Sequence, residues 1–225
     1  LYLSTLLIEH KDVETFDEAR GLIDTLSSIV DVFKVGSQIF TACGPVIVRH
    51  ILAKGKNVFL DLKYHDIPNT VAHAIQAAVS LNKAVATALN QEGKKIEALG
   101  ALEMLTIHTQ GGEEMCSFAA QAATKTAEAI GVRKPLLVGI TVLTSQQKED
   151  NIRNLVLERA RLAQRSGLDG VVASSQEAVY IREEFGNDFI IVTPGIRPLD
   201  SDAGDQKRIT TPKEAVENGS DYRVV

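Results

Sequence analysis

Short apolar runs recur along the chain, and each is followed by a stretch with helical spacing. The runs are continuously apolar rather than alternately apolar and polar, which is typical of strands that are buried on both faces. Strands of this kind occur in parallel sheets covered by helices. The pattern predicts strands at 1–8, 32–36, 57–63, 102–108, 135–142, 169–174, 189–192 and 221–225.

The number of these units predicts the architecture. Eight units in 225 residues fit a (β/α)8 TIM barrel, of the α/β class, better than an open sheet. A doubly wound dinucleotide-binding fold is disfavoured because no Gly-x-Gly-x-x-Gly motif follows the first strand. No linker or low-complexity tract divides the sequence, so we expect a single domain over 1–225.

One region interrupts the repeat. The segment between Thr70 and His108 is longer than one helix and a short loop require, and 90–95 has the composition of an exposed turn. We therefore predict an extended segment at about 82–100, either a lengthened helix or a helical hairpin on the outside of the barrel.

Composition excludes several classes of protein. Residues are 44% hydrophobic and 24% charged, which is ordinary for a globular domain. The net charge of −5 argues against nucleic-acid binding through overall basicity. No apolar run approaches the roughly 20 residues that span a bilayer. Cys43 and Cys116 match no metal-binding spacing, so we expect two reduced thiols in a cytoplasmic protein.

The densest group of functional side chains follows the third predicted strand, where 61–70 reads Asp-Leu-Lys-Tyr-His-Asp-Ile-Pro-Asn-Thr. Asp61 and Lys63 are two residues apart, so on a strand they point to the same face. Asp66 lies beyond the strand and also fits the N-cap of a helix entered at Pro68. Clustered charges are costly to hold unless they pair, and they are useful where a ligand binds.

Further polar residues stand where other predicted strands end, and the active site of a (β/α)8 barrel lies at those ends. We expect them to face one cavity with Asp61, Lys63 and Asp66; they are Asp12, Lys34, His108, Thr141, Thr144, Ser174 and Arg197. Taken alone, Asp61 and Lys63 are equally well explained as a structural ion pair, and His108 is better explained as a core histidine. The addition of Lys34 and Asp66 favours a functional network.

Two features predict an anion site near the seventh and eighth strands. Gly195 precedes Arg197, and a turn there brings backbone N–H groups toward an anion. The loop at 204–208, which contains Gln206, adds further donors. Outside a barrel this loop would be read as a solvated basic turn, but phosphate sites in such barrels often use these loops.

The chain resembles the orotidine 5′-monophosphate decarboxylase family, in its bacterial form, over nearly its whole length. Segment 61–70 is close to the family signature, and six more motifs follow the family's order. They are Phe33-Lys-Val-Gly36, Phe40-Thr-Ala-Cys-Gly-Pro45, Thr141-Val-Leu-Thr-Ser145, Gly167-Leu-Asp-Gly-Val-Val172, Thr193-Pro-Gly-Ile-Arg197 and Ala203-Gly-Asp-Gln206. A lone Asp-x-Lys-x-x-Asp is weakly specific, whereas all seven motifs together are highly specific.

The resemblance implies decarboxylation of orotidine 5′-monophosphate to uridine 5′-monophosphate, the last step of pyrimidine nucleotide synthesis, without a cofactor or metal. It also implies a homodimer with shared active sites, and neither a nucleic-acid nor a membrane partner. Lys34, Asp61 and Lys63 would come from one chain and Asp66 and Thr70 from the other, with Lys63 as the proton donor. The remaining substrate contacts would be Asp12 and Lys34 to the ribose, Thr144 near the base, Arg197 and Gln206 to the phosphate, and His108 on the fourth strand.

Two alternatives stay open at this point. A metal-dependent sugar-phosphate lyase or decarboxylase of the same superfamily shares Asp-x-Lys-x-x-Asp, although the continuation Ile-Pro-Asn-Thr favours the orotidylate enzyme. A catalytically inactive nucleotide-binding homologue is suggested only by the C-terminus, and the four catalytic residues argue against it. The family continues with a Gly-Arg pair and a closing helix, so we expect the C-terminal end of the barrel to be truncated or to lie outside this sequence.

Overall fold

The computed structural model describes residues 6–8, 13–92, 99–143, 151–197 and 210–225. Strands in these residues are β1 (Leu6–Ile8), β2 (Val32–Gly36), β3 (Asn57–Tyr64), β4 (Leu102–His108), β5 (Leu136–Ile140), β6 (Gly170–Val172), β7 (Ile190–Thr193) and β8 (Tyr222–Val224). Helices are α1 (Phe16–Leu26), α2 (Ser37–Cys43), α3 (Val46–Ala53), α4 (Pro68–Gln91), η1 (Thr109–Gly111), α5 (Gly112–Ile130), α6 (Ile152–Arg165), α7 (Ser175–Phe185) and α8 (Pro212–Glu217).

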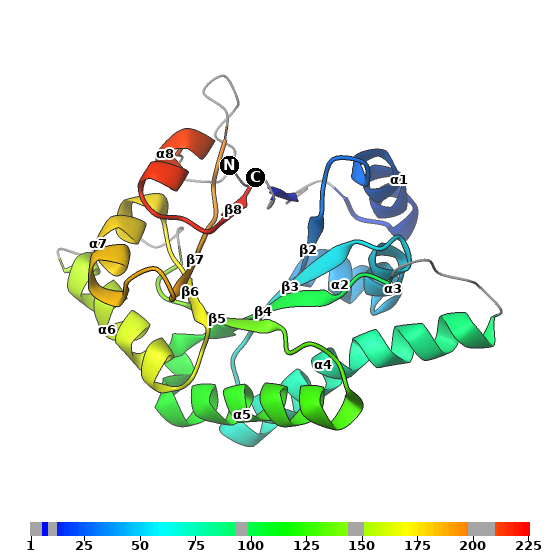
Figure 1. The fold of residues 1–225 in the computed structure, drawn as a ribbon, viewed down its shortest axis with the longest axis horizontal. Helices are drawn as coiled ribbons and strands as arrows, with labels where there is room; N and C mark the ends of the chain where they lie inside the picture. Colours follow the sequence, from blue (N-terminus) through cyan, green and yellow to red (C-terminus); the bar gives the residue numbers. More distant parts are fainter. Residues whose placement is uncertain (1–5, 9–12, 93–98, 144–150, 198–209) are drawn as a thin grey trace.

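The strands pair in parallel and in chain order, from β1 to β8. The order closes because β8 also pairs with β1, through Leu6↔Arg223 and Leu7↔Val224. Figure 1 shows the strands as a curled sheet with the helices on its outer face. The predicted α/β class with a parallel sheet is therefore confirmed.

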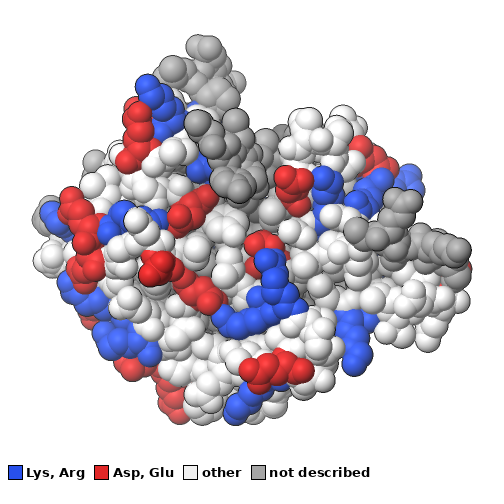
Figure 2. Space-filling view, viewed as in Figure 1, with Lys and Arg blue, Asp and Glu red and all other residues white. Residues whose placement is uncertain are grey.

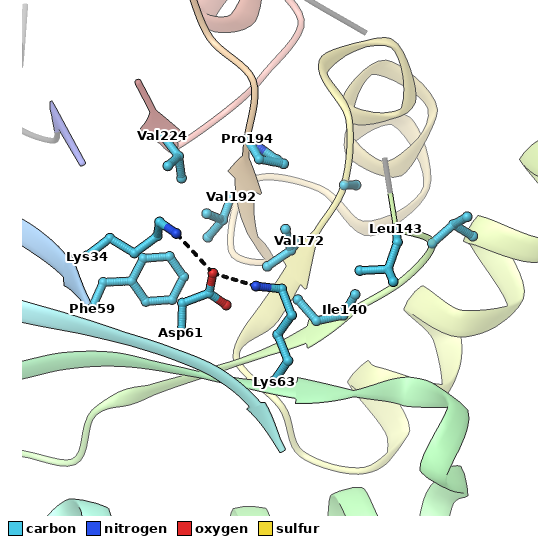
Figure 3. A pocket seen from close by; sticks show the side chains of 12 residues that line it. Lys34, Phe59, Asp61, Lys63, Ile140, Leu143, Val172, Val192, Pro194 and Val224 are labelled. Carbon is cyan, nitrogen blue, oxygen red and sulfur yellow. Dashed lines mark hydrogen bonds and ion pairs between the residues drawn. The ribbon is translucent and has the colours of Figure 1, made fainter. Parts of the chain in front are cut away.

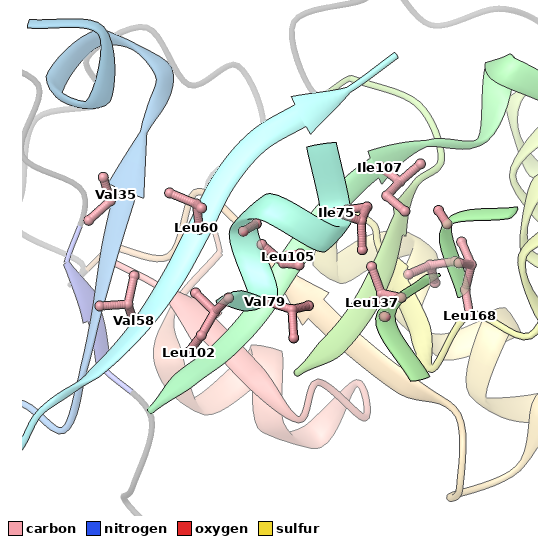
Figure 4. Close-up of a cluster of buried hydrophobic side chains, with 14 of the residues drawn as sticks. Val35, Val58, Leu60, Ile75, Val79, Leu102, Leu105, Ile107, Leu137 and Leu168 are labelled. Atoms are coloured by element: carbon pink, nitrogen blue, oxygen red, sulfur yellow. The ribbon is translucent and has the colours of Figure 1, made fainter. Parts of the chain in front are cut away.

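Alternate residues of each strand supply two different cores. On β3, Val58 and Leu60 face outward, where they meet Ile75 and Val79 of α4 in the larger cluster (Figure 4). Phe59, between them in sequence, faces the inside of the sheet instead. The inner cluster consists of Val32, Phe59, Met104, Val138, Val192 and Val224. Burial on both faces explains why the strands are continuously apolar.

The long helix α4 continues to Gln91 and packs against α5 beneath the sheet (Figure 1). It begins with Pro68 in its first turn, where a missing N–H costs nothing. The suggestion that Asp66 is its N-cap is wrong, since Ile67 occupies that position without a side-chain cap. The Asp66 carboxylate instead accepts a hydrogen bond from the Ile67 N–H at 2.7 Å.

Helix α2 is absent from the sequence prediction. Its seven residues form two turns, too short for a clear helical period, and it ends at Gly44 with a φ of +62°. Helix α1 shows the opposite situation, since Thr15 and Glu18 form a capping box that marks its start in the sequence. In the described part of the chain, no helix is long and apolar enough to cross a membrane.

Candidate active site

An ion network lies at the C-terminal edge of β2 and β3. The Lys63 ammonium donates to Asp61 Oδ2 at 2.7 Å, and the Lys34 ammonium approaches the same oxygen at 3.4 Å (Figure 3). The side chains of Lys34 and Asp61 are only 7% and 9% exposed, while that of Lys63 is 37% exposed. The network therefore has one buried ammonium and one that water and a ligand can reach.

Strand periodicity explains where this network sits. Residues two positions beyond inner-core residues point into the same interior, one layer nearer the C-terminal edge. Lys34 follows Val32 in this way, and Asp61 follows Phe59. The register pairs Gly36 with Asp61, so the long Lys34 side chain reaches toward the carboxylate along the strand direction. The charged side chains of Lys34 and Asp61 therefore lie one layer above the apolar inner cluster, toward the C-terminal ends of the strands.

The Asp61 carboxylate is held in its ionised form. Burial raises the pKa of Asp61, but the charges of Lys34 and Lys63, and hydrogen bonds from Lys63 and Thr106, outweigh burial. The net effect is a pKa below the ordinary value for aspartate. A carboxylate that stays charged fixes two ammonium groups beside the cavity.

The cavity above the network has two chemically different sides (Figure 3). Lys34, Asp61 and Lys63 form the charged side, beside the ring of Phe59. The other side is almost wholly apolar and is lined by Ile140, Val142, Leu143, Val172, Ala173, Val192, Pro194 and Val224. Such an apolar wall strengthens electrostatic interactions by excluding water. On the side of the molecule shown in Figure 2, by contrast, Lys and Arg are interspersed with Asp and Glu.

Strand β3 is irregular at the site. Leu60 pairs with Leu105 and Tyr64 with Ile107, so three residues of β3 stand opposite Thr106 alone. Lys63 has a φ of +51°, and among the described residues it is the only one other than glycine with a positive φ. The irregularity lies where the ion network forms, which is common for β-bulges near active sites.

Thr106 fills this irregularity, and sequence reasoning missed it. Its hydroxyl donates to Asp61 Oδ1 at 2.9 Å and accepts from the Lys63 backbone N–H at 2.8 Å. The side chain is fully buried. The one available signal was its position, two residues after Met104 of the inner core, but the pairing across to β3 is not visible in the sequence.

Other predicted site residues lie apart from the network. Asp66 and Thr70 are exposed, and no ion pair between described residues includes Asp66. Arg197 is half-buried after β7; its side chain donates to the Ile196 carbonyl at 2.9 Å, beyond the turn at Gly195 with its φ of +74°. Predictions for Asp12, Thr144 and Gln206 fall outside the described residues.

The expectation that every polar residue at a strand end faces one cavity is wrong, because among the described residues of that set only Lys34, Asp61 and Lys63 line the cavity. The Thr141 hydroxyl donates to the Val172 carbonyl at 2.8 Å. Ser174 is the N-cap of α7. His108 does not line the cavity; its ring lies 5.5 Å from that of His65. Burial, followed by the charges of His65 and Lys63, lowers the pKa of His108.

Metal ligands are not grouped in this part of the chain. Among the described residues, no three His, Cys, Asp or Glu side chains are placed to hold one ion. Both oxygens of Asp61 already accept hydrogen bonds, Oδ1 from Thr106 and Oδ2 from Lys63. The arrangement suits the fixing of positive charge beside a reacting atom.

Comparisons with known proteins identify the family. The family model described as "Orotidine 5'-phosphate decarboxylase / HUMPS family" matches residues 11–225. A protein named orotidine 5'-phosphate decarboxylase from Pseudoalteromonas translucida is 44% identical over 223 residues, covering 95% of this chain and 85% of the relative. One of the same name from Geotalea daltonii is 41% identical over 222 residues, covering 95% and 84%.

A solved structure agrees with these relatives. The crystal structure of orotidine 5'-phosphate decarboxylase from Lactobacillus acidophilus has a TM-score of 0.74 and 31% sequence identity to this chain. The similarity covers 99% of this chain and 89% of that one. The chain therefore belongs to the orotidine 5'-phosphate decarboxylase / HUMPS family.

Proposed function

We propose that this protein decarboxylates orotidine 5′-monophosphate to uridine 5′-monophosphate, the last step of pyrimidine nucleotide synthesis. The observation that carries the proposal is the ion network itself: one buried carboxylate binds two ammonium groups at the mouth of a cavity. Membership of the family and the names of its relatives support the same reaction.

The chemistry requires a fixed positive charge. When the bond between C6 of the pyrimidine and its carboxylate breaks, the electron pair stays on C6 and CO2 leaves. No adjacent group takes up this charge, so the protein must stabilise it. We assign that role to the Lys63 ammonium, which then gives a proton to C6 and is reprotonated from water. Its 37% exposure leaves it accessible from the cavity.

The other groups of the network hold the Lys63 ammonium in place. Asp61 accepts its hydrogen bond, and Lys34 holds Asp61 from the opposite side. Asp61 would also stand close to the carboxylate of the bound substrate and repel it, which would favour its loss as CO2. The apolar wall opposite would receive uncharged CO2 more readily than a carboxylate.

Remote contacts would supply binding energy for this step. We assign Asp12 and Lys34 to the ribose, Thr144 to the base, and Arg197 with Gln206 to the phosphate. His108 stands at the end of β4 beside His65, and we place it at the edge of the substrate site. These assignments rest on the family motifs that contain the residues, since only Lys34 lines the described cavity.

We further propose that the protein is a homodimer with shared active sites. Asp66 and Thr70 are exposed, and Ile67 between them is a large apolar residue with 66% exposure. Exposed apolar side chains of this kind are suited to burial against a second copy. In such a dimer Asp66 and Thr70 would complete the partner's site, while Lys34, Asp61 and Lys63 serve their own.

Three broader assignments complete the proposal. The full protein would be an eightfold (β/α)8 barrel, because β8 pairs with β1 and a helix follows each of β1 to β7. We place it in the cytoplasm, in keeping with its two free cysteines, Cys43 and Cys116. We expect catalysis without a cofactor and no nucleic-acid partner.

The test is turnover without metal. The full-length protein is treated with EDTA and incubated with orotidine 5′-monophosphate, and the absorbance change of the base is followed. We expect rapid turnover, lost in Lys63→Ala because the proton donor is gone. Lys56→Ala is the matched control, since Lys56 is also ion-paired, to Asp31, but lies outside the cavity. No turnover by intact protein would contradict the proposal.

A metal requirement is the outcome that distinguishes the rival. If turnover of orotidine 5′-monophosphate is absent and a divalent metal ion enables decarboxylation or cleavage of a sugar phosphate, the metal-dependent branch of the superfamily is favoured. The occupied oxygens of Asp61 support the metal-free reaction.

A further inference from the structure

The structure places one buried hydroxyl between the two groups on which the proposed reaction depends. Thr106 Oγ1 donates to the carboxylate of Asp61 and accepts from the backbone N–H of Lys63. Both hydrogen-bonding functions of the hydroxyl are therefore used, its proton and a lone pair. Few side chains do both from a single atom, and only serine and threonine are this small.

The second contact matters because of the backbone of Lys63. A φ of +51° is unfavourable for a residue with a side chain, by on the order of 1 kcal/mol or more. In a regular ladder the N–H groups of β3 would find carbonyl partners on a neighbouring strand, but the register is broken between Leu60 and Tyr64. The Thr106 hydroxyl satisfies the Lys63 N–H in place of a ladder partner.

The first contact fixes the carboxylate. Asp61 Oδ2 faces the two lysines, so Oδ1 must be satisfied from elsewhere, and Thr106 supplies the donor at 2.9 Å. With one oxygen held by β4, the carboxylate plane cannot rotate without breaking a buried hydrogen bond. Thr106 therefore influences the orientation of the Lys63 side chain in two ways: it bonds the Lys63 backbone N–H, and it fixes the Asp61 carboxylate to which the Lys63 ammonium donates.

We propose that Thr106 is a positioning residue for the decarboxylation, setting the backbone of Lys63 and the orientation of Asp61 from the neighbouring strand. It does not touch the cavity, so it acts through those two residues. The inference rests on the proposed function for its kinetic consequence, but the contact of Thr106 with the Lys63 backbone stands independently of any substrate.

Thr106→Val tests the proposal, because valine keeps the shape of threonine without its hydroxyl. We expect kcat to fall on the order of 10- to 100-fold, the range for losing hydrogen bonds to a charged group, while KM stays within about threefold. Thr106→Ser should restore kcat to within about threefold of the wild type, because the hydroxyl returns. A variant that lost activity through packing alone would not show this recovery.

Thr109→Val is the matched control. Thr109 is also a buried threonine near the end of β4, and its hydroxyl donates to the Ile140 carbonyl at 2.7 Å rather than to the network. Its loss should lower stability but leave kcat unchanged. Wild-type kcat in Thr106→Val, or an equal loss in Thr109→Val, would overturn the proposal.

A measurement without substrate separates this inference from the proposed function. Amide hydrogen exchange should show the Lys63 N–H protected in the wild type and in Thr106→Ser, and exposed in Thr106→Val. If the wild type does not turn over orotidine 5′-monophosphate, the proposed function fails, and the exchange of Lys63 still decides whether Thr106 holds it. Fast exchange of Lys63 in the wild type would refute the positioning role even if Thr106→Val does not fold.

Discussion

Replacement of Asp61 by asparagine should reveal which lysine makes the network costly to break. Asp61→Asn keeps the shape of the side chain but removes the negative charge beside two ammonium groups. Charges 3.4 Å apart, like those of Lys34 and Asp61, attract by on the order of 5 kcal/mol at an effective dielectric constant of about 20. Desolvation opposes this attraction, so removal of one partner from a buried pair typically costs about 3–5 kcal/mol.

The exposure of each lysine, rather than its distance from Asp61, should decide how much it contributes to the destabilisation caused by Asp61→Asn. Lys63 is the closer partner at 2.7 Å, but at 37% exposure it can turn to water, so its share is small. Lys34 is only 7% exposed, so water compensates little for the loss of its carboxylate partner. Adding Lys34→Met to Asp61→Asn should therefore restore much of the lost stability, whereas adding Lys63→Met should restore little.

Urea unfolding at pH 7 and fixed protein concentration measures these free energies. The lowered pKa of Asp61 adds a second readout. Its stabilisation is present above the unfolded carboxyl pKa of about 3.9 and is lost as pH falls through the lower folded value. The difference in unfolding free energy between the wild type and Asp61→Asn should therefore become smaller as the pH is lowered. The reasoning would be refuted if Asp61→Asn lost less than about 1 kcal/mol of unfolding free energy at pH 7. It would also be refuted if Lys34→Met and Lys63→Met restored the same amount of stability to Asp61→Asn.

Two further predictions concern the proposed homodimer and the pH dependence of stability. Lys63→Ala and Asp66→Ala should each be nearly inactive, but refolded together they should regain about a quarter of wild-type activity, because half the dimers are mixed and each has one intact site. No recovery would argue against shared sites. His108 should titrate in NMR below its ordinary pKa, since burial and the charges of His65 and Lys63 disfavour the imidazolium. The stability that neutral His108 contributes is fully present above its unfolded pKa of about 6.5 and is lost as pH falls through its lower folded-state pKa. His108→Gln should therefore reduce the loss of unfolding free energy in acid. An NMR titration midpoint of His108 at the ordinary histidine pKa would contradict this prediction.

Much of the fold could be predicted because its signals are local. Continuous apolar runs marked the strands, and the predicted bounds of β2 and β4 agree with the structure at both ends. The capping box of Thr15 and Glu18 at the start of α1 is likewise a local signal. Helix α2 was missed because two turns carry too little periodicity, and Asp66 was misassigned as a cap because the N-cap position depends on where the chain turns.

The candidate site was predictable in part for the same reason. The period of two placed Asp61 and Lys63 on one face, and the position of Lys34 on β2 suggested a third member. What failed was the rule that polar residues at strand ends share a cavity. Thr141 satisfies a neighbouring carbonyl instead, and His108 packs beside His65.

The sequence by itself determined the order of the strands and of most helices, the burial of the strands on both faces, and the identity of the charged residues that follow them. Those properties follow from side-chain polarity and spacing along one strand at a time. Only the tertiary structure decided that three residues of β3 stand opposite Thr106, that Lys63 takes a positive φ, and that one hydroxyl bonds both the Asp61 carboxylate and the Lys63 backbone N–H. Register between strands far apart in the chain depends on how they pack, which no local pattern encodes.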